Sequence, residues 1–287
     1  MPTISQAIAE GARRLSARGN DPRRTAGVLL CHVLGIDRTH LLTNSEQHID
    51  ENRYRDYLAM VDRRASGVPV QHLTGHQEFY GLDFIVNAGV LIPRPETEFL
   101  VGRIIDLVKA TNPASPLIVD IGTGSGCIAV SLAVNLPVAK FIATDASEPA
   151  LATAKTNAER HRVLDRIEFM EGDLLAPFAG RGFEGTFDIL ASNPPYVDFA
   201  EPELIQLEVL EWEPRQALFG GVGGVEFYRR LLEDGLKFLK PGGHLVVEIG
   251  YGQLDAVSEM IEGSSWKLID VIRDLQGIPR TLTIGKR

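Results

Sequence analysis

The sequence contains little cysteine, no long apolar run and no excess of basic residues, and each absence narrows the possibilities. Its 287 residues include two cysteines, Cys31 and Cys127, whose separation matches neither a disulfide framework nor a metal-binding spacing. Two buried thiols in a reducing compartment are the simplest interpretation. No apolar run reaches the ~20 residues that cross a bilayer, and the N-terminal stretch "MPTISQAIAEGARRLSARG" is amphipathic rather than signal-like. The sequence predicts a cytoplasmic protein with no membrane partner and no metal site.

Basic residues are outnumbered, with 29 Lys and Arg against 38 Asp and Glu, which gives a net charge of −9 at pH 7. Proteins that hold DNA or RNA unaided usually carry a basic surface, because phosphate contacts dominate that affinity. We therefore expect no direct nucleic-acid binding. An acidic surface can still steer a basic protein partner towards its site.

Residues 1–75 are predicted to form a small helical domain that recognises the substrate. Apolar residues recur there at spacings of three and four, and no strand pattern appears. Asp21 and Pro22 mark a helix start, while Gly35 and Gly67 mark helix ends. The predicted helices cover residues 7–15, 21–35 and 51–67.

Residues 76–92 change in character and predict a β-hairpin that links this domain to the rest of the chain. Aromatic and β-branched residues flank a turn at Gly81 and a second turn at residues 87–89. The stretch "PRPETEFL" follows, and its two prolines forbid sheet but permit a helix start, with Glu96 or Thr97 as its cap.

Residues 93–287 are predicted to form an α/β domain, in which strands alternate with helices from residue 117 onward. Such alternation implies a doubly wound, mostly parallel sheet. The last two strands are joined by the short link "LQGIPR" and are therefore expected to be antiparallel, which gives a seven-stranded mixed sheet. The predicted strands are 117–121, 140–145, 166–173, 187–193, 244–250, 266–274 and 281–287, and the predicted helices are 127–136, 148–160, 226–239 and 253–262.

The first strand ends in a glycine-rich turn, "DIGTGSG", that opens a helix. Glycines at 122, 124 and 126 allow the backbone to approach a ligand, and the helix N-terminus favours negative charge. Cys127 occupies the position of the third glycine of a dinucleotide fingerprint, so the pattern disfavours NAD. Asp120 suits a ligand that carries an ammonium group, held directly or through water. S-adenosylmethionine has an ammonium group, a carboxylate and a sulfonium, and we expect it to bind here.

The next two strands also end in acidic residues, on the same edge of the predicted sheet. Asp145 follows the glycine turn by about 20 residues, where an acidic side chain accepts the hydroxyl protons of a ribose. Asp173 is positioned to accept from the exocyclic amine of an adenine, and Leu174 to cover one face of the ring. Three signals on successive strand ends predict an adenosine-bearing cofactor.

The fourth strand ends in Asn193-Pro194-Pro195-Tyr196, which is expected to lie beside the methyl donor. A planar NH2 group is a poor nucleophile because its lone pair is delocalised. The Asn193 side-chain oxygen and the Pro194 carbonyl can each accept one of its N–H bonds, and Tyr196 can stack on the planar group. Orientation and electrostatic assistance then aim the nitrogen at the sulfonium. The four residues alone leave both an adenine and an amide open as the substrate.

The chain resembles the peptide chain release factor glutamine methyltransferases in several blocks at once. These are "HLTGHQEFYGLDFIVNAGVLIPRPETEFL", "DIGTGSG", "SNPPY", "EPRQALFGG", "GGHLVVEIG" and "DLQGIPR", which run from about His72 to Arg280. The resemblance implies methyl transfer from S-adenosylmethionine to the glutamine of the Gly-Gly-Gln loop of class-1 release factors. It also implies a helical domain ahead of the hairpin.

The resemblance further implies roles for particular residues. The cofactor would contact Asp145, Asp173, Leu174, Asn193 and the loop Gly122, Thr123, Gly124, Ser125 and Gly126. Asn193, Pro194, Pro195 and Tyr196 would bind the target amide and carry the catalysis. Some family members have Trp at the position of Leu174, so the apolar cover there is smaller in this chain.

Two further segments are interpreted as possible lids. In the segment Arg94–Glu98 we expect Arg94 to pair with Glu96 while Phe99 covers the cofactor, with a simple linker as the alternative. The acidic segment "DFAEPELIQLEVLEWEP" is either a solvated helix face or an acidic docking edge for a basic partner. Its acidic residues are Asp198, Glu201, Glu203, Glu208, Glu211 and Glu213.

Three other functions compete with glutamine methylation. Adenine-N6 methylation uses the same chemistry, but a duplex enzyme must flip its base and needs a recognition surface, which the net charge disfavours. An NAD-linked oxidoreductase is disfavoured by Cys127 and by the prolines at the fourth strand end. A catalytically silent binding module would not need all of the cofactor signals.

Overall fold

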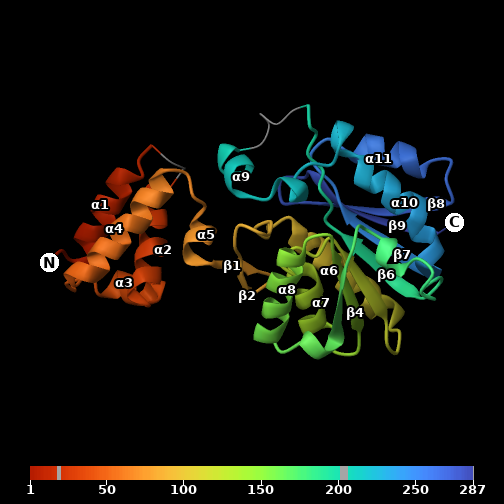
Figure 1. Cartoon of the computed structure of the whole chain (residues 1–287), viewed down its shortest axis with the longest axis horizontal. Helices are drawn as coiled ribbons and strands as arrows, with labels where there is room; N and C mark the ends of the chain where they lie inside the picture. Colours follow the sequence, from red (N-terminus) through yellow and green to blue (C-terminus); the bar gives the residue numbers. More distant parts are fainter. Residues whose placement is uncertain (18–20, 201–205, 287) are drawn as a thin grey trace. The chain divides into compact units, whose positions relative to one another are not determined.

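The computed structural model describes residues 1–17, 21–200 and 206–286, which fall into two compact units (Figure 1). The first unit contains Met1–His76 together with Leu207–Trp212. The second contains Gln77–Gln206 and Glu213–Arg287. The sequence did not indicate that a segment after residue 200 belongs with the N-terminal helices.

The first unit is helical, as the sequence predicts, and its ends are set by recognisable caps. The Asp21 carboxylate accepts the Arg24 N–H at 3.0 Å, and Gly35 ends the same helix with φ 68°. Tyr57 lies at the centre of the core, where its hydroxyl donates to the Ala7 carbonyl at 3.2 Å. The helices are α1 (Ile4–Arg14), α2 (Pro22–Leu34), α3 (Arg38–Thr43), α4 (Glu51–Ala65), α5 (Val70–Thr74) and α9 (Leu207–Trp212).

Helix α9 joins this unit through one aromatic side chain and one ion pair. Trp212 packs against the helical core. Glu208 accepts from Arg64 at 2.6 Å, and both side chains are partly buried. The sequence missed this placement because an acidic six-residue helix carries no periodic pattern long enough to assign it to a core.

The second unit begins with the predicted hairpin, although its strands are shorter than residues 76–92. Strands β1 (His76–Phe79) and β2 (Leu82–Ile85) are joined by Tyr80 and Gly81, both with positive φ, which is the geometry of a tight hairpin turn. The segment after β2 turns at residues 87–90 instead of pairing. The side-chain amide of Asn157 in α8 (Glu148–Arg160) accepts from the Ile85 N–H and donates to the Ile85 carbonyl, which fixes the hairpin's end.

A seven-stranded sheet in the order β5-β4-β3-β6-β7-β9-β8 forms the centre of the second unit. β3 to β7 run parallel, and β9 runs antiparallel to both β7 and β8, so the predicted mixed sheet is confirmed. β7 is longer than predicted because its first residue, Leu239, already pairs with Phe187. The strands are β3 (Leu117–Ile121), β4 (Lys140–Asp145), β5 (Ile167–Glu171), β6 (Phe187–Ser192), β7 (Leu239–Glu248), β8 (Trp266–Arg273) and β9 (Pro279–Lys286).

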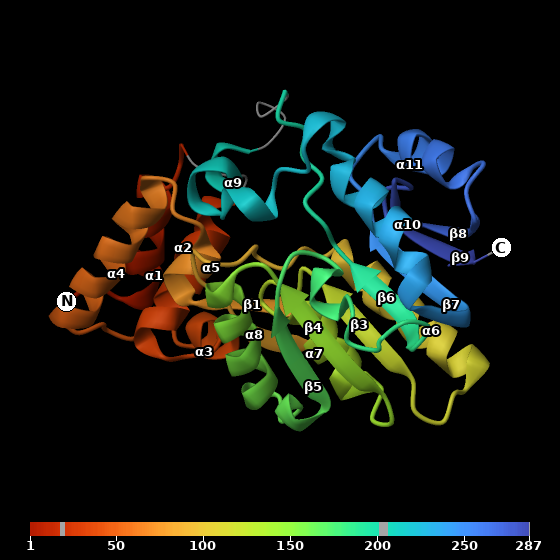
Figure 2. The same ribbon diagram turned by 45° about the vertical axis from the view of Figure 1, so that its right-hand side comes forward.

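Helices cover both faces of this sheet (Figure 2). α6, α7 and α8 pack on one face with Phe79 and Phe84 of the hairpin, and α10 and α11 pack on the other. These helices are α6 (Thr97–Thr111), α7 (Cys127–Asn135), α8 (Glu148–Arg160), α10 (Glu226–Phe238) and α11 (Leu254–Ile261). Short 3-10 turns are η1 (Leu164–Arg166), η2 (Ala176–Phe178), η4 (Arg215–Ala217) and η5 (Val222–Gly224). The fold is that of a doubly wound α/β domain.

Candidate active site

A cavity lies at the carboxyl ends of four adjacent parallel strands of the second unit. The strand order reverses between β3 and β6, which is where ligands bind in doubly wound sheets. Each strand end contributes lining residues, and further residues come from four other segments, among them Ala150 of α8. The lining from the strand ends is Ile121, Gly122, Gly124, Asp145, Ala146, Ser147, Gly172, Asp173, Leu174, Ser192, Asn193, Pro194 and Pro195; the rest includes Gly89, Val90, Leu91, Pro214, Gln216, Ala217 and Phe227.

The glycine turn presents open backbone to this cavity. Gly122 and Gly124 have φ of 72° and 56°, and a Cβ at either position would meet no atom within 4 Å. A ligand can therefore approach the main chain closely at these two residues. Gly126 has a different role, since a Cβ there would lie 3.0 Å from the Ala154 Cβ of α8. The third glycine thus lets α7 and α8 pack together.

Asp145 lines the cavity with its carboxylate held in place by main-chain donors. Oδ2 accepts the Gly124 N–H and Oδ1 accepts the Ser147 N–H, each at 2.9 Å. Burial raises the pKa of Asp145, and the backbone hydrogen bonds oppose that shift. Lone pairs remain on the carboxylate, which can accept from ligand hydroxyls.

Asp173 and Leu174 also line the cavity, and a residue that the sequence did not indicate lies with them. Asp173 pairs with Arg230 of α10 at 2.5 Å, so its carboxylate is not free of partners. Leu174 has φ 50° and contributes an apolar wall. Phe227, the second residue of α10, adds an aromatic ring to the lining. No motif marks Phe227, because only the packing of α10 brings it to the end of β5.

Asp120, Thr123 and Ser125 are brought to the glycine turn but not to the cavity lining. Asp120 is fully buried and accepts from the Thr123 hydroxyl at 2.6 Å and from the Ala129 N–H at 3.1 Å. Burial raises its pKa to about 7. In this structure the Asp120 carboxylate braces the loop and the first turn of α7. Its contact with a ligand ammonium, directly or through water, stays a prediction.

Asn193 and Pro194 lie at the end of β6 with acceptors available to a ligand. The Asn193 Nδ2 donates to the Thr97 hydroxyl at 3.0 Å, which leaves its Oδ1 as the atom that can serve the cavity. Among the described residues, no hydrogen bond uses the Pro194 carbonyl. The two acceptors match the two N–H bonds of a planar NH2 group.

Tyr196 lies outside the lining of the cavity, where the sequence had suggested that it stacks on the substrate. Its ring lies against Gly250, where a Cβ would come within 2.8 Å of the ring carbon Cδ2. Its carbonyl accepts from the Gln253 Nε2 at 2.9 Å. Burial raises the pKa of its phenol, so the hydroxyl stays protonated. In this structure Tyr196 anchors the chain after Pro195, and its stacking on a substrate stays a prediction.

The segment ahead of α6 is clamped by an ion pair different from the predicted one. Arg94 bonds Glu213 at 2.6 Å instead of Glu96, and the buried Glu213 carboxylate also accepts the Ile92 N–H at 3.0 Å. Phe99 does not reach the cavity. The lid hypothesis is therefore wrong in its pairing and in its aromatic cover. The clamp instead joins two cavity-lining segments, at residues 89–91 and 214–217.

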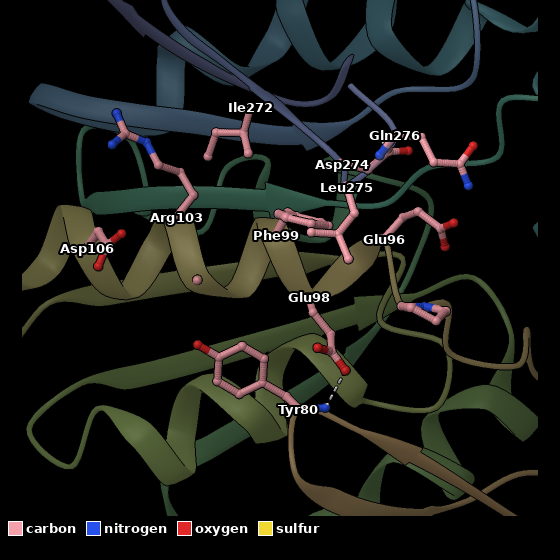
Figure 3. A pocket seen from close by; sticks show the side chains of 12 residues that line it. Tyr80, Glu96, Glu98, Phe99, Arg103, Asp106, Ile272, Asp274, Leu275 and Gln276 are labelled. Atoms are coloured by element: carbon pink, nitrogen blue, oxygen red, sulfur yellow. Dashed lines mark hydrogen bonds between the residues drawn. The ribbon is translucent and has the colours of Figure 1, made fainter. Parts of the chain in front are cut away.

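A second cavity, of about 570 Å³, lies beside α6 and the turn between β8 and β9 (Figure 3). It is larger than the cavity at the strand ends, at about 210 Å³, yet none of the glycine-turn or Asn-Pro-Pro residues lines it. Phe99 and Arg103 point into it, and the Glu98 carboxylate accepts the Tyr80 N–H at 2.9 Å. The chemistry of the lining, not the volume, makes the strand-end cavity the candidate active site.

The acidic segment after Tyr196 is distributed among different environments. Glu213 is buried and Glu208 is paired with Arg64, so neither forms a free acidic edge. Asp198 accepts the Ala200 N–H, and Glu211 is exposed. The predicted roles of Glu201 and Glu203 fall on residues outside those that the structure describes. In the described parts of the chain no helix is long and apolar enough to cross a membrane, and no acidic, His or Cys group gathers as for a metal.

Comparison with known proteins gives matches over nearly the whole chain. A family model described as PrmC N-terminal domain matches residues 6–75, and one described as Methyltransferase small domain matches residues 98–211. A release factor glutamine methyltransferase of Koribacter versatilis (strain Ellin345) is 40% identical over 287 residues, which is 99% of this chain and 99% of that protein.

Two solved structures share the fold at low sequence identity. The hMettl16 catalytic domain in complex with the MAT2A 3'UTR hairpin 6 has a TM-score of 0.56 and 20% identity, and the match covers 79% of this chain and 81% of that chain. The N-terminal domain of human METTL16 in complex with SAH has a TM-score of 0.51 and 20% identity, and covers 85% and 86%. Both are similar to this chain in architecture.

Proposed function

The chain belongs to the family of release factor glutamine methyltransferases, and from this membership we propose that it methylates the glutamine of the Gly-Gly-Gln motif of class-1 peptide chain release factors. The methyl group would come from S-adenosylmethionine and go to the side-chain nitrogen, N5. The observation that carries the proposal is the 40% identity to a protein of that name across 99% of both chains. The Asn-Pro-Pro strand end beside an open glycine turn supports it independently.

We infer that this cavity would hold S-adenosylmethionine, which supplies an electrophilic methyl group. Open backbone at Gly122 and Gly124 allows close approach of the ligand's main body. Asp145 offers two oxygens to a ribose, and Leu174 and Phe227 offer apolar faces to an adenine. The SAH bound in a human protein of the same fold is consistent with this choice.

Asn193 and Pro194 would hold the glutamine amide. Each of the two acceptors takes one N–H bond, which orients the nitrogen and raises its electron density. The nitrogen then forms its bond to the methyl carbon as the carbon–sulfur bond breaks, and it afterwards loses one proton to solvent. No strong base is required before attack, since the proton leaves from an already cationic nitrogen.

Adenine-N6 methylation is the weaker alternative. The net charge of −9 disfavours a phosphate-binding surface, and the relative at 40% identity is named for glutamine methylation. We infer that the protein partner is a release factor, that nucleic acid is not bound directly, and that the reaction takes place in the cytoplasm, where release factors work.

A methyl-transfer assay tests the proposal. The purified protein is incubated with methyl-labelled S-adenosylmethionine and, separately, with a class-1 release factor or with duplex DNA. We expect label to enter the release factor and not the DNA. A matched release factor whose Gly-Gly-Gln glutamine is replaced should stay unlabelled. Labelled DNA beside an inert release factor would overturn the proposal.

A further inference from the structure

The segment "IPRPETE" at residues 92–98 is the motif for which the cavity lining gives no role. Its residues Pro95, Glu96 and Glu98 face the second cavity (Figure 3). Thr97, the first residue of α6, behaves differently: it is 2% exposed and lies on the side of the active site. A buried hydroxyl needs hydrogen-bond partners, so the question is which groups Thr97 serves.

Thr97 connects two polar residues from neighbouring strands. Its Oγ accepts from the Asn193 Nδ2 at 3.0 Å, at the end of β6. Glu248, the last residue of β7, is 1% exposed and follows Val247, the register partner of Ser192, so it lies beside Asn193 on the neighbouring strand. The Thr97 hydroxyl acts on its carboxyl and lowers its pKa, and Glu248 Oε2 has no other hydrogen-bond partner among the described residues. β6 and β7 are parallel neighbours, so the two side chains emerge at the same edge of the sheet. The three groups form the chain Glu248, Thr97, Asn193.

A threonine hydroxyl has one proton, and this fixes the direction of the whole chain. A carboxylate can only accept, so Thr97 gives its proton to Glu248. The Thr97 oxygen then has only lone pairs to offer Asn193, which must present its NH2. The Asn193 Oδ1 is left facing the cavity as an acceptor. A neutral donor at residue 248 would allow the Thr97 proton to turn towards Asn193 and the amide to flip.

We propose that Thr97 and Glu248 are positioning residues that hold the Asn193 amide with its oxygen towards the substrate nitrogen. The inference rests on the proposed function for its catalytic consequence, but the amide orientation itself is a property of the free protein. A flipped Asn193 would direct an NH2 at the substrate NH2, so donor would meet donor. Thr97 of "RPETE" and Glu248 of "VVEIG" thus share one role.

The surroundings of Glu248 make its ionisation sensitive to pH. Burial raises its pKa to about 7, and the Thr97 hydrogen bond opposes that shift. Arg280 and Arg94 favour the ionised form of Glu248 and lower its pKa, whereas Glu96 disfavours the ionised form and raises the pKa. The groups that interact with it are Arg280 of β9, Arg94 and Glu96 ahead of α6, Tyr196 after β6, Tyr228 of α10 and Cys127 of α7. The methylation rate should therefore rise as pH increases through about 7.

Three threonine variants separate positioning from packing. Thr97→Val keeps the shape but removes the hydroxyl, Thr97→Ser keeps the hydroxyl, and Thr111→Val makes the same change at the exposed end of α6. We expect Thr97→Val to lower kcat ~100-fold with little change in the dissociation constant of S-adenosylhomocysteine. Thr97→Ser should retain most of the rate and Thr111→Val all of it. Equal losses in Thr97→Ser and Thr97→Val, or none in Thr97→Val, would overturn the proposal.

A second measurement does not depend on catalysis or on the folding of Thr97→Val. The side-chain NH2 resonances of Asn193 are followed by NMR against pH in the wild type and in Glu248→Gln. We expect them to titrate near pH 7 in the wild type and to lose that titration in Glu248→Gln. Identical titrations in both proteins would refute the relay. A wild type that shows the titration yet leaves release factor unmethylated would refute the proposed function and leave the relay standing.

Discussion

Asp120 and Asp145 are carboxylates at the ends of adjacent strands, yet the fold gives them opposite environments. Asp145 lines the cavity and is held by two main-chain N–H groups. Asp120 is fully buried under the glycine turn, and its Oδ1 has no hydrogen-bond partner among the described residues. The residue type at a strand end therefore does not by itself determine what the residue does. The direction in which its side chain points decides whether it can contact a ligand.

The burial of Asp120 predicts a particular dependence of stability on pH. Its pKa is about 7 in the folded protein against 3.8 for the free group, so the folded state binds the proton more tightly. Its contribution to stability is complete below pH 3.8 and is lost as pH rises towards 7. Asp120→Asn should weaken this fall in the free energy of unfolding, measured by urea titration at several pH values. A slope identical to that of the wild type would contradict the assignment.

At the residue scale, the sequence predicts which chemical groups stand at the strand ends better than it predicts where their side chains point. The Asn193 and Pro194 acceptors and the Asp145 carboxylate lie at the cavity as proposed from strand-end positions. Tyr196 and Asp120 do not, because alternation along a strand cannot say how the turn after it rotates. Phe227 and Thr97 were missed for another reason, since each reaches the site only through the packing of a helix against the sheet.

At the scale of elements, the cavity depends on segments that are far apart in the sequence. The Glu213 carboxylate binds Arg94 and the Ile92 N–H, so it fastens the stretch ahead of α6 to the stretch that follows α9. Both stretches line the cavity within one unit. A buried carboxylate with a charged and a main-chain donor is costly to remove, because both donors lose their partner.

The clamp predicts a loss of stability together with a loss of cofactor binding. Glu213→Ala should lower the free energy of unfolding by about 3 kcal/mol and weaken binding of S-adenosylhomocysteine. Glu211→Ala is the matched control, since that side chain is exposed, and it should change neither quantity. Thermal or urea unfolding and calorimetric titration supply the two measurements. Wild-type binding and stability in Glu213→Ala would show that the clamp is dispensable.

The elements themselves follow closely from the sequence. Strands β3 and β4 and helix α8 begin and end at the predicted residues, because regular apolar periodicity is a local signal. In the structure the Ser147 side chain caps α8 by accepting the Ala150 N–H. α3 and α5 were not predicted, since helices of five or six residues carry too few turns for a pattern. α9 falls in the acidic segment, for which a solvated helix face was one of the two interpretations. Of the two candidate caps of α6, Glu96 holds the cap position, although it makes no side-chain capping hydrogen bond.

At the scale of the whole molecule, the helical unit and the acidic net charge account for the choice of substrate better than the catalytic motif does. Asn193-Pro194-Pro195-Tyr196 can serve any planar NH2 group. The family-specific helical unit and the net charge of −9 favour a protein substrate over a nucleic acid. The methyltransferase fold alone would not decide this, since the same fold occurs in a protein solved with an RNA hairpin.

The position of the transferred methyl group tests the central claim most directly. A class-1 release factor is treated with the wild-type protein or with Asn193→Ala in the presence of S-adenosylmethionine, and its peptides are sequenced by mass spectrometry. We predict one added methyl group on the Gly-Gly-Gln glutamine with the wild type. Asn193→Ala should lose ~100-fold or more of the rate while still binding S-adenosylhomocysteine. An unmodified glutamine, or methylation that persists at the wild-type rate in Asn193→Ala, would contradict the account.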